Sequence, residues 1–256
     1  MTGALQLEWL KFRRSLVARV ATTLAVLATP VFAVGAVALA RNTPMQGPMA
    51  AKFEPLTHGT LNEAQLAVAG QILAVVMLLT GGFVSTWMFG REWADRTIGS
   101  LFANAVTRRA IGWAKVTIIV GWALVCVSAA VALTTAAGAI IAPHGFTAAV
   151  RQQAYVVWGA SAIMALLGLP FACVAVVTRG YLGAIGVLIG TTAISQILAA
   201  VGVGRWTPYV APPMWAGAGG PEQALLVGPI HLIWAMAFAA IGTYAAVRAF
   251  AHARLD

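Results

Sequence analysis

Long intervals without any charged residue divide the chain into six apolar segments. These intervals are bounded by Arg19 and Arg41, Glu63 and Arg91, Lys115 and Arg151, Arg151 and Arg179, Arg179 and Arg205, and Glu222 and Arg248. Each is long enough for the roughly 20 apolar residues that cross the hydrocarbon core of a bilayer as a helix. The segments are continuous and rich in Ala, Leu, Val and Gly, which favours helices over the alternating strands of a β-barrel.

This pattern predicts an all-α, polytopic membrane protein with about six transmembrane helices. We expect a single transmembrane domain over residues 1–256, with spans at about residues 20–40, 66–89, 116–142, 154–178, 181–203 and 225–247. Pro170 interrupts the fourth span and is expected to kink it, because proline removes a helical hydrogen bond. Gly186 and Gly190 form a GxxxG pattern in the fifth span, which permits close approach of another helix, in this subunit or in a second one.

The segment before the first span, about residues 3–17, has a helical pattern of its own. Four apolar residues recur at helical spacing and form a narrow stripe: Leu5, Trp9, Phe12 and Leu16. Glu8, Lys11 and Arg13 fall away from that stripe. We therefore predict an amphipathic helix at the membrane interface, with its stripe toward the acyl chains. The alternative is a plain basic flank, which we favour less.

Composition agrees with a membrane protein and explains the strong positive charge. Hydrophobic residues make up 61% of the chain and charged residues 9%, whereas soluble domains carry about 25% charged residues. The net charge is +9. Twelve of the 16 Lys and Arg residues fall on the side that holds both termini. The positive-inside rule then places both termini in the cytoplasm of a bacterial-type plasma membrane, and nucleic acid is not needed to explain the charge.

The sequence lacks the residue patterns that ATP hydrolysis, metal binding and ion-coupled transport commonly require. None of the lysines lies in a GxxxxGK[ST] loop, so the chain is not expected to hydrolyse ATP, and the histidines show no metal-ligand spacing. No acidic residue occurs between Asp95 and Glu222, and we expect the remaining acids in loops or tails. Ion-coupled carriers commonly hold carboxylates inside the bundle. We therefore predict a protein that is not an enzyme and binds no cofactor or metal.

The loop between the second and third spans carries the clearest local pattern. Thr97 is suited to cap a short helix, and Thr107 to cap the entry into the third span. Ile98, Leu101 and Phe102 then share one helical face. Such an apolar knob outside the membrane suits a groove on a cytoplasmic partner. By physics alone, a plain charged connector is an equally good interpretation.

A resemblance decides between these two interpretations. The loop resembles the pattern of ABC-2 type transporter permeases in the following residues: Glu92, Arg96-Thr97, Leu101-Phe102, Thr107-Arg108-Arg109 and Lys115. Arg96 stands where the family usually has Gly, and Ala105-Val106-Thr107-Arg108 replaces a Pro-Val-Ser-Arg element. The resemblance implies a coupling helix that docks on an ATP-binding subunit. It assigns this coupling role to eight residues: Glu92, Arg96, Thr97, Ile98, Leu101, Phe102, Arg108 and Arg109.

In outline the whole chain is similar to small permeases of bacitracin- and lantibiotic-type exporters. The resemblance implies a membrane-spanning permease subunit that exports an amphiphilic peptide, drug or lipid-like molecule. ATP would be bound by a separate ATP-binding cassette ATPase subunit, and the permease would form a homodimer or a heterodimer with a related permease, in contact with membrane lipid. The alternatives are an ion-coupled secondary carrier and a non-transporting membrane scaffold or assembly factor.

Overall fold

The computed structural model of the chain describes residues 2–43, 60–99, 106–142, 145, 147–201 and 204–253. These residues form helices and turns and no strands. The helices run over the following ranges: α1 Thr2–Arg14, α2 Leu16–Asn42, α4 Leu61–Ala94, α6 Arg108–Ile141, α7 Ala148–Leu166, α8 Phe171–Val177, α9 Leu182–Ala200, α10 Ala211–Trp215, α11 Pro221–Leu225 and α12 Pro229–Ala251.

Within the described ranges, six helical segments are long and apolar enough to cross a membrane. They are α2, α4, α6, the combined α7 and α8, α9 and α12. This confirms the predicted all-α class with six candidate spans. The two longest helices, α4 and α6, have 34 residues each, which corresponds to roughly 50 Å of helix. Because this exceeds the roughly 30 Å of the hydrocarbon core, each extends beyond the membrane.

Side-chain caps set the starts of the main helices. Thr60 forms a capping box with Glu63 at the start of α4. The Thr107 hydroxyl accepts a hydrogen bond from the Ala110 amide at 3.3 Å, as its predicted role at the entry of α6 requires. Ser15 separates α1 from α2, and its hydroxyl accepts from the Ala18 amide at 3.0 Å. Each cap satisfies an amide that would otherwise lack a partner at the helix start.

The fourth candidate span is interrupted where the sequence predicts a kink. Helix α7 ends at Leu166, and α8 begins at Phe171, directly after Pro170. Gly168 lies in the turn against α4, and a Cβ atom at this position would come within 2.5 Å of the Gly82 amide nitrogen. The break therefore brings the backbone of this turn into direct contact with α4, which only a glycine permits.

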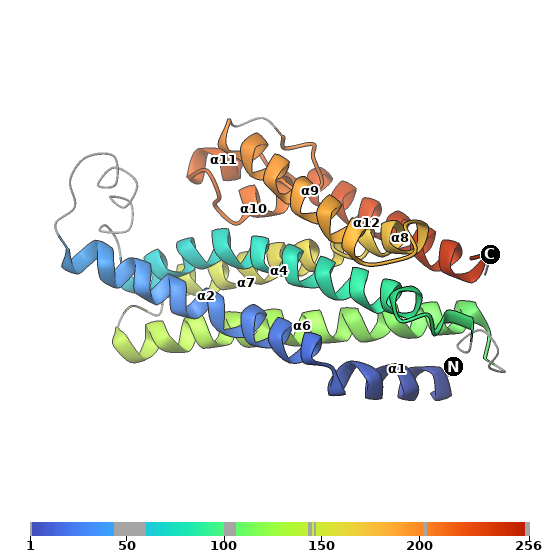
Figure 1. Ribbon diagram of the computed structural model, residues 1–256. Helices are drawn as coiled ribbons and strands as arrows, with labels where there is room; N and C mark the ends of the chain where they lie inside the picture. Colours follow the sequence, from blue (N-terminus) through green and yellow to red (C-terminus); the bar gives the residue numbers. More distant parts are fainter. Residues whose placement is uncertain are drawn as a thin grey trace.

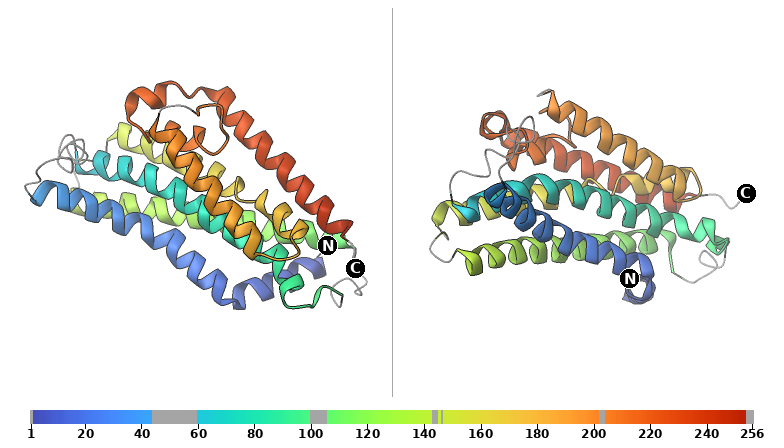
Figure 2. Two further views of the ribbon diagram at one scale, coloured as in Figure 1. Left: turned by 45° about the horizontal axis from the view of Figure 1, so that its top comes forward. Right: turned by 60° about the vertical axis from the view of Figure 1, so that its left-hand side comes forward.

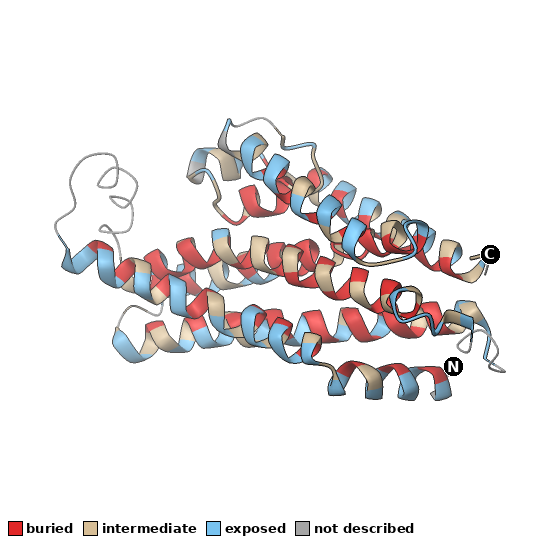
Figure 3. Cartoon of the chain, viewed as in Figure 1, coloured by how far each residue is buried: buried red, intermediate tan, exposed pale blue. Residues whose placement is uncertain are grey.

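Helix α4 lies at the centre of the bundle and α9 at its edge (Figures 1 and 2). Of the apolar window in each helix, 61% is buried in α4 but only 22% in α9. Figure 3 shows the same contrast, with buried residues along α4 and exposed ones along α9. A Cβ at Gly186 or Gly190 would meet nothing within 4 Å. The GxxxG pattern of α9 thus makes no close helix contact in the described part of this chain.

Both chain termini lie at one end of the bundle, together with the end of α4 and the start of α6 (Figure 1). A hydrogen bond of 2.9 Å from the Arg108 guanidinium to the Ala253 carbonyl joins the start of α6 to the C-terminal segment. We call this the terminal end of the bundle. The short helices α10 and α11 lie at the opposite end.

Candidate functional site

The predicted coupling segment begins with a sharply defined helix end. Helix α4 ends at Ala94, and Arg96 follows in a left-handed conformation, with φ of 56°. The Thr97 amide donates to the Glu92 carbonyl at 2.8 Å, and the Arg96 amide donates to the Trp93 carbonyl at 3.1 Å. This pair of bonds defines a Schellman motif, whose left-handed residue is usually glycine. The motif explains why the resembling family has Gly where this chain has Arg96.

The described residues of the segment then start a new helical turn. Ile98 and Gly99 are helical and directly follow Thr97, where the sequence predicts a cap. Ile98 is partly buried and packs against the hydrophobic core of this chain. Leu101 and Phe102, the other two residues of the predicted knob, lie outside the described residues. Of the two predicted arginines at the start of α6, Arg109 is exposed, and Arg108 contacts the C-terminal segment.

Directly beside this segment, a buried lysine joins three helices. Lys115 of α6 is fully buried, with an exposed fraction of 0%. Its Nζ donates to Glu8 Oε2 of α1 at 2.9 Å, to Glu92 Oε1 of α4 at 2.8 Å and to the Met88 carbonyl at 2.7 Å. Glu8 and Glu92 are 1% and 3% exposed. The three donor positions of the ammonium are therefore all used, as a buried cation requires.

Two further cations surround the carboxylates. Arg91 Nη2 lies 3.4 Å from Glu8 Oε2, and Arg91 Nε lies 3.3 Å from Glu92 Oε1. The Arg91 guanidinium also stacks over the Trp87 ring, at 4.5 Å from its centroid. Lys11 Nζ lies 2.9 Å from Glu8 Oε1. We call Glu8, Lys11, Arg91, Glu92 and Lys115 the charged cluster.

Charge pairing keeps the buried carboxylate of α1 ionised. Burial opposes the ionisation of Glu8, but the neighbouring Lys115 ammonium, followed by that of Lys11, outweighs this effect. The pKa of Glu8 is therefore held below its ordinary value. Glu92 is less completely satisfied, because its Oε2 is buried without a hydrogen-bond partner within the described residues.

The charged cluster corrects one expectation from the sequence. The prediction that the acids lie in loops or tails is wrong for Glu8 and Glu92, which lie inside the helix packing. Leu5 and Trp9, from the stripe that was predicted to face the acyl chains, are exposed, whereas Phe12 of that stripe is buried together with Ala4 and Glu8. Residues four apart share a helix face, so Glu8 is carried inward between Ala4 and Phe12. The sequence signal that could have found it is a cation, Lys115, at the start of an apolar span.

The arrangement can transmit movement between parts of the chain. Glu92 lies only a few residues before the turn at Arg96, and through Lys115 it is bonded to Glu8 on α1. A displacement of the end of α4 must therefore break or move buried ion pairs to α1 and α6. Within the described residues there is no group of three or more metal-ligating side chains.

Comparison with known proteins places most of the chain in one family. Residues 4–195, well over half of the sequence, match the family model described as ABC-2 family transporter protein. The matched range includes the charged cluster and the coupling segment. No curated protein and no solved structure matches the chain.

Proposed function

We propose that this chain, which belongs to the ABC-2 transporter family, is the permease subunit of an ATP-driven exporter. Its proposed substrates are amphiphilic peptides, drugs or lipid-like molecules. ABC-2 permeases are multi-pass membrane proteins without catalytic activity. They bind no cofactor, because ATP is bound by a separate ABC ATPase partner. The direction of transport and the substrate class rest on the resemblance to bacitracin- and lantibiotic-type exporters.

The observation that carries this proposal is the link between the coupling segment and the charged cluster. An ATPase docked on residues 96–109 would push on the end of α4 and the start of α6. Glu92 and Lys115, which lie on these two helices, pair at 2.8 Å. Because Lys115 also pairs with Glu8 at 2.9 Å, the same push would reach α1. A displacement of this segment would thus be transmitted to α1 through buried ion pairs, whereas a plain connector would have no such contacts.

The orientation and the assembly belong to the same proposal. The terminal end faces the cytoplasm of a bacterial-type plasma membrane, because most of the Lys and Arg residues lie on that side. Two permease subunits, identical or related, form the transport pathway. Support for this comes from α9, which exposes large apolar side chains and leaves Gly186 and Gly190 without close neighbours.

Capture of the ATPase by membrane-inserted variants tests the proposal. An ABC ATPase from the same genome is expected to copurify with the wild type, and Leu101→Asp or Phe102→Asp is expected to weaken this capture at least tenfold. Each places a carboxylate where the predicted knob would enter an apolar groove, at a cost of several kcal/mol. Ala94→Asp is the matched control, because it adds the same charge at an exposed position at the end of α4.

Three outcomes contradict the proposal. Full capture and full export by both aspartate variants would make residues 96–109 an ordinary connector. Transport by the purified chain that follows an ion gradient without any ATPase would favour the secondary carrier. Absence of both transport and ATPase capture would favour the scaffold or assembly factor.

A further inference from the structure

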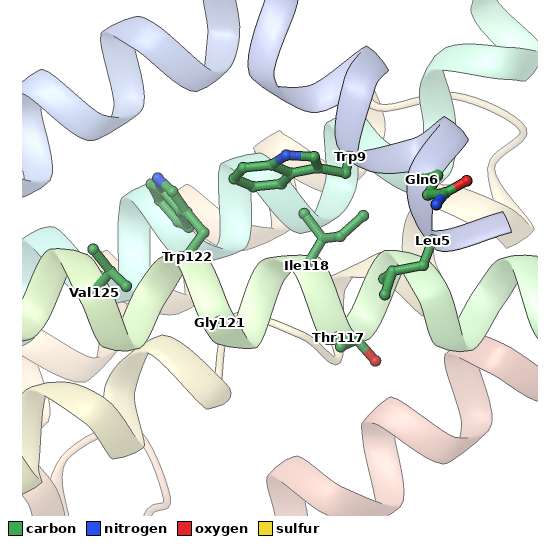
Figure 4. A pocket seen from close by; sticks show the side chains of 8 residues that line it. All are labelled: Leu5, Gln6, Trp9, Thr117, Ile118, Gly121, Trp122 and Val125. Carbon is green, nitrogen blue, oxygen red and sulfur yellow. The ribbon is translucent and has the colours of Figure 1, made fainter. Parts of the chain in front are cut away.

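Two grooves are lined in part by residues of α1 and α6. Trp9 of α1 and Trp122 of α6 line both of them. The first groove, shown in Figure 4, has a volume of about 510 Å³. Figure 4 shows the Trp9 ring over α6 beside Trp122, with Gly121 leaving the helix surface bare below it. This groove is almost entirely apolar: its lining residues are Leu5, Gln6, Trp9, Thr117, Ile118, Gly121, Trp122 and Val125.

The second groove lies between α1, α2 and α6 and differs in its charge. Its volume is about 610 Å³, within the range of ligand sites in proteins. Arg13 and Arg19 line one part of it, and Val26 and Leu27, about two turns beyond Arg19 on α2, line another. The remaining lining residues are Trp9, Phe12, Ala18, Thr22, Thr23 and Trp122. The walls of this second groove are therefore cationic in one part and apolar in another.

The two arginines of this groove are available for a ligand. Arg13 and Arg19 are exposed, and neither guanidinium forms an ion pair or hydrogen bond to any residue in the part of the chain that the structure describes. By contrast, the nearby Arg91 is committed to Glu8 and Glu92. Arg19 is the last charged residue before the charge-free first span, so this cationic part of the groove lies at the boundary between water and the apolar membrane.

We propose that the groove between α1, α2 and α6 binds an anionic phospholipid of the leaflet at the terminal end of the bundle. Arg13 and Arg19 would hold the phosphate by charge-assisted hydrogen bonds, and one acyl chain would run past Trp122 to Val26 and Leu27. The polarity of the groove matches this ligand, since cations near a membrane surface attract anionic headgroups. A wholly apolar ligand would leave both arginines unused.

Trp122 gives the groove a fixed wall. Its Nε1 donates to the Thr22 hydroxyl at 2.8 Å, which holds the indole between α6 and α2. Phe12 packs edge-on against the same ring, with centroids 5.9 Å apart. Trp9 is 47% exposed, as suits an amphipathic ring at the headgroup level. The wall exists without the lipid, so little ordering is needed for binding.

Occupancy of the groove would fix α1 in place beside the charged cluster. Phe12 and Arg13 of the groove are one helical turn from Glu8, which is bonded to Lys115. A bound lipid would hold α1 against α2 and α6 and so maintain the ion pairs of the cluster. This inference does not depend on the export function, because it concerns only the described helices and the lipid.

Binding is tested with the purified chain in nanodiscs of phosphatidylcholine that contain a photoreactive phosphatidylglycerol probe. We expect labelling of peptides from α1 and α2 by the probe. Arg13→Gln combined with Arg19→Gln should reduce labelling about tenfold, since each surface cation contributes to headgroup attraction. Arg14→Gln is the matched control, an exposed neighbouring arginine that does not line the groove, and it should leave labelling within twofold of the wild type.

A second variant pair tests the apolar part without changing charge. Thr23→Trp fills the groove and should also reduce labelling, whereas Val31→Trp on the exposed surface of the same helix should not. Equal loss for Arg14→Gln and the double variant would show unspecific surface attraction and overturn the proposal. So would unchanged labelling of Thr23→Trp, or full competition by water-soluble glycerol phosphate. The far-ultraviolet circular dichroism spectrum of each variant in the same nanodiscs checks that its helices remain folded.

Discussion

The two ends of the bundle use different residues for the same backbone conformation. At the terminal end, the described non-glycine residues with positive φ are arginines, Arg96 with φ of 56° and Arg179 with φ of 51°. At the opposite end, between α9 and α12, positive φ occurs at glycines, among them Gly204 and Gly217. A left-handed conformation costs a residue with a Cβ roughly 1–2 kcal/mol. The terminal end therefore keeps cations at turns where glycine would be more stable.

The two ends of the bundle also differ in the interior contacts that join their helices. The terminal end is joined by buried ion pairs around Lys115. The opposite end is joined by amide and backbone contacts, such as the 3.1 Å hydrogen bond from the Asn62 amide to the Ala142 carbonyl. Gly70 of α4 there lies so close to Ala216 that a Cβ would come within 2.7 Å of the Ala216 carbonyl oxygen. Close backbone packing occurs at the terminal end as well, where a Cβ atom at Gly90 would come within 2.7 Å of the Tyr181 amide nitrogen. Because ion pairs can be broken by moving one partner, we expect movement to start at the charged cluster.

The largest expected effect follows from removing the shared cation of the charged cluster. Lys115→Met leaves Glu8 and Glu92 buried without their central partner and should destabilise the protein by about 3–5 kcal/mol. Thermal unfolding in detergent micelles measures this loss. The double variant with Glu92→Gln should recover most of it, because the remaining carboxylate of Glu8 keeps Lys11 and Arg91 as partners. A double variant as unstable as Lys115→Met would mean that packing, and not charge, holds this end together.

Close packing at the opposite end is probed by Gly70→Ala. The added methyl group meets the Ala216 carbonyl, and overpacking of this kind costs about 1–3 kcal/mol. Gly121→Ala is the matched control, because its Cβ meets nothing within 4 Å and should stabilise α6 by about 0.5–1 kcal/mol. Unfolding midpoints of the two variants should thus move in opposite directions. Equal shifts of the two unfolding midpoints would contradict the distinction between the closely packed surface at Gly70 and the open surface at Gly121.

Exchanging the turn residues tests the contrast between arginine and glycine. Arg96→Gly should stabilise the protein by about 1 kcal/mol, because the left-handed residue of the Schellman motif loses its strain. Gly217→Ala at the opposite end, where φ is 100°, should destabilise it by a similar amount. Arg96→Ala serves as the control for charge, since it keeps the Cβ and should bring no gain. If it stabilised as much as Arg96→Gly, repulsion among cations would be the cause.

The smallest expected effect is a dependence on pH at the terminal end. Glu8 has a lowered pKa in the folded protein, so its stabilising contribution is full above its ordinary value of 4.5 and is lost as the pH falls through the lowered pKa. Wild type should therefore unfold at a higher temperature than Glu8→Gln at pH 7. The difference should shrink below pH 4.5. A difference that stayed constant down to pH 2 would show that Glu8 acts through shape alone.

Local patterns in the sequence were sufficient for the helices and for part of the candidate site. The cap at Thr107 and the break before Pro170 depend on neighbouring residues alone, and both were predicted. Polarity alone did not reveal the buried face of α1, which carries Ala4, Glu8 and Phe12. In the fold, Glu8 faces inward since Lys115, more than a hundred residues away in the chain, supplies the opposite charge.

The sequence by itself determined the all-α class, the candidate spans and the asymmetry of charge, because bilayer thickness and charge placement act on consecutive residues. Only the tertiary structure decided that Glu8, Glu92 and Lys115 meet, that Arg96 occupies a conformation suited to glycine, and that Arg13 and Arg19 border one groove. Each of these depends on the rotation of one helix relative to another. Apolar spans tolerate many rotations in lipid, so the choice is made by a few polar contacts and by packing between distant segments.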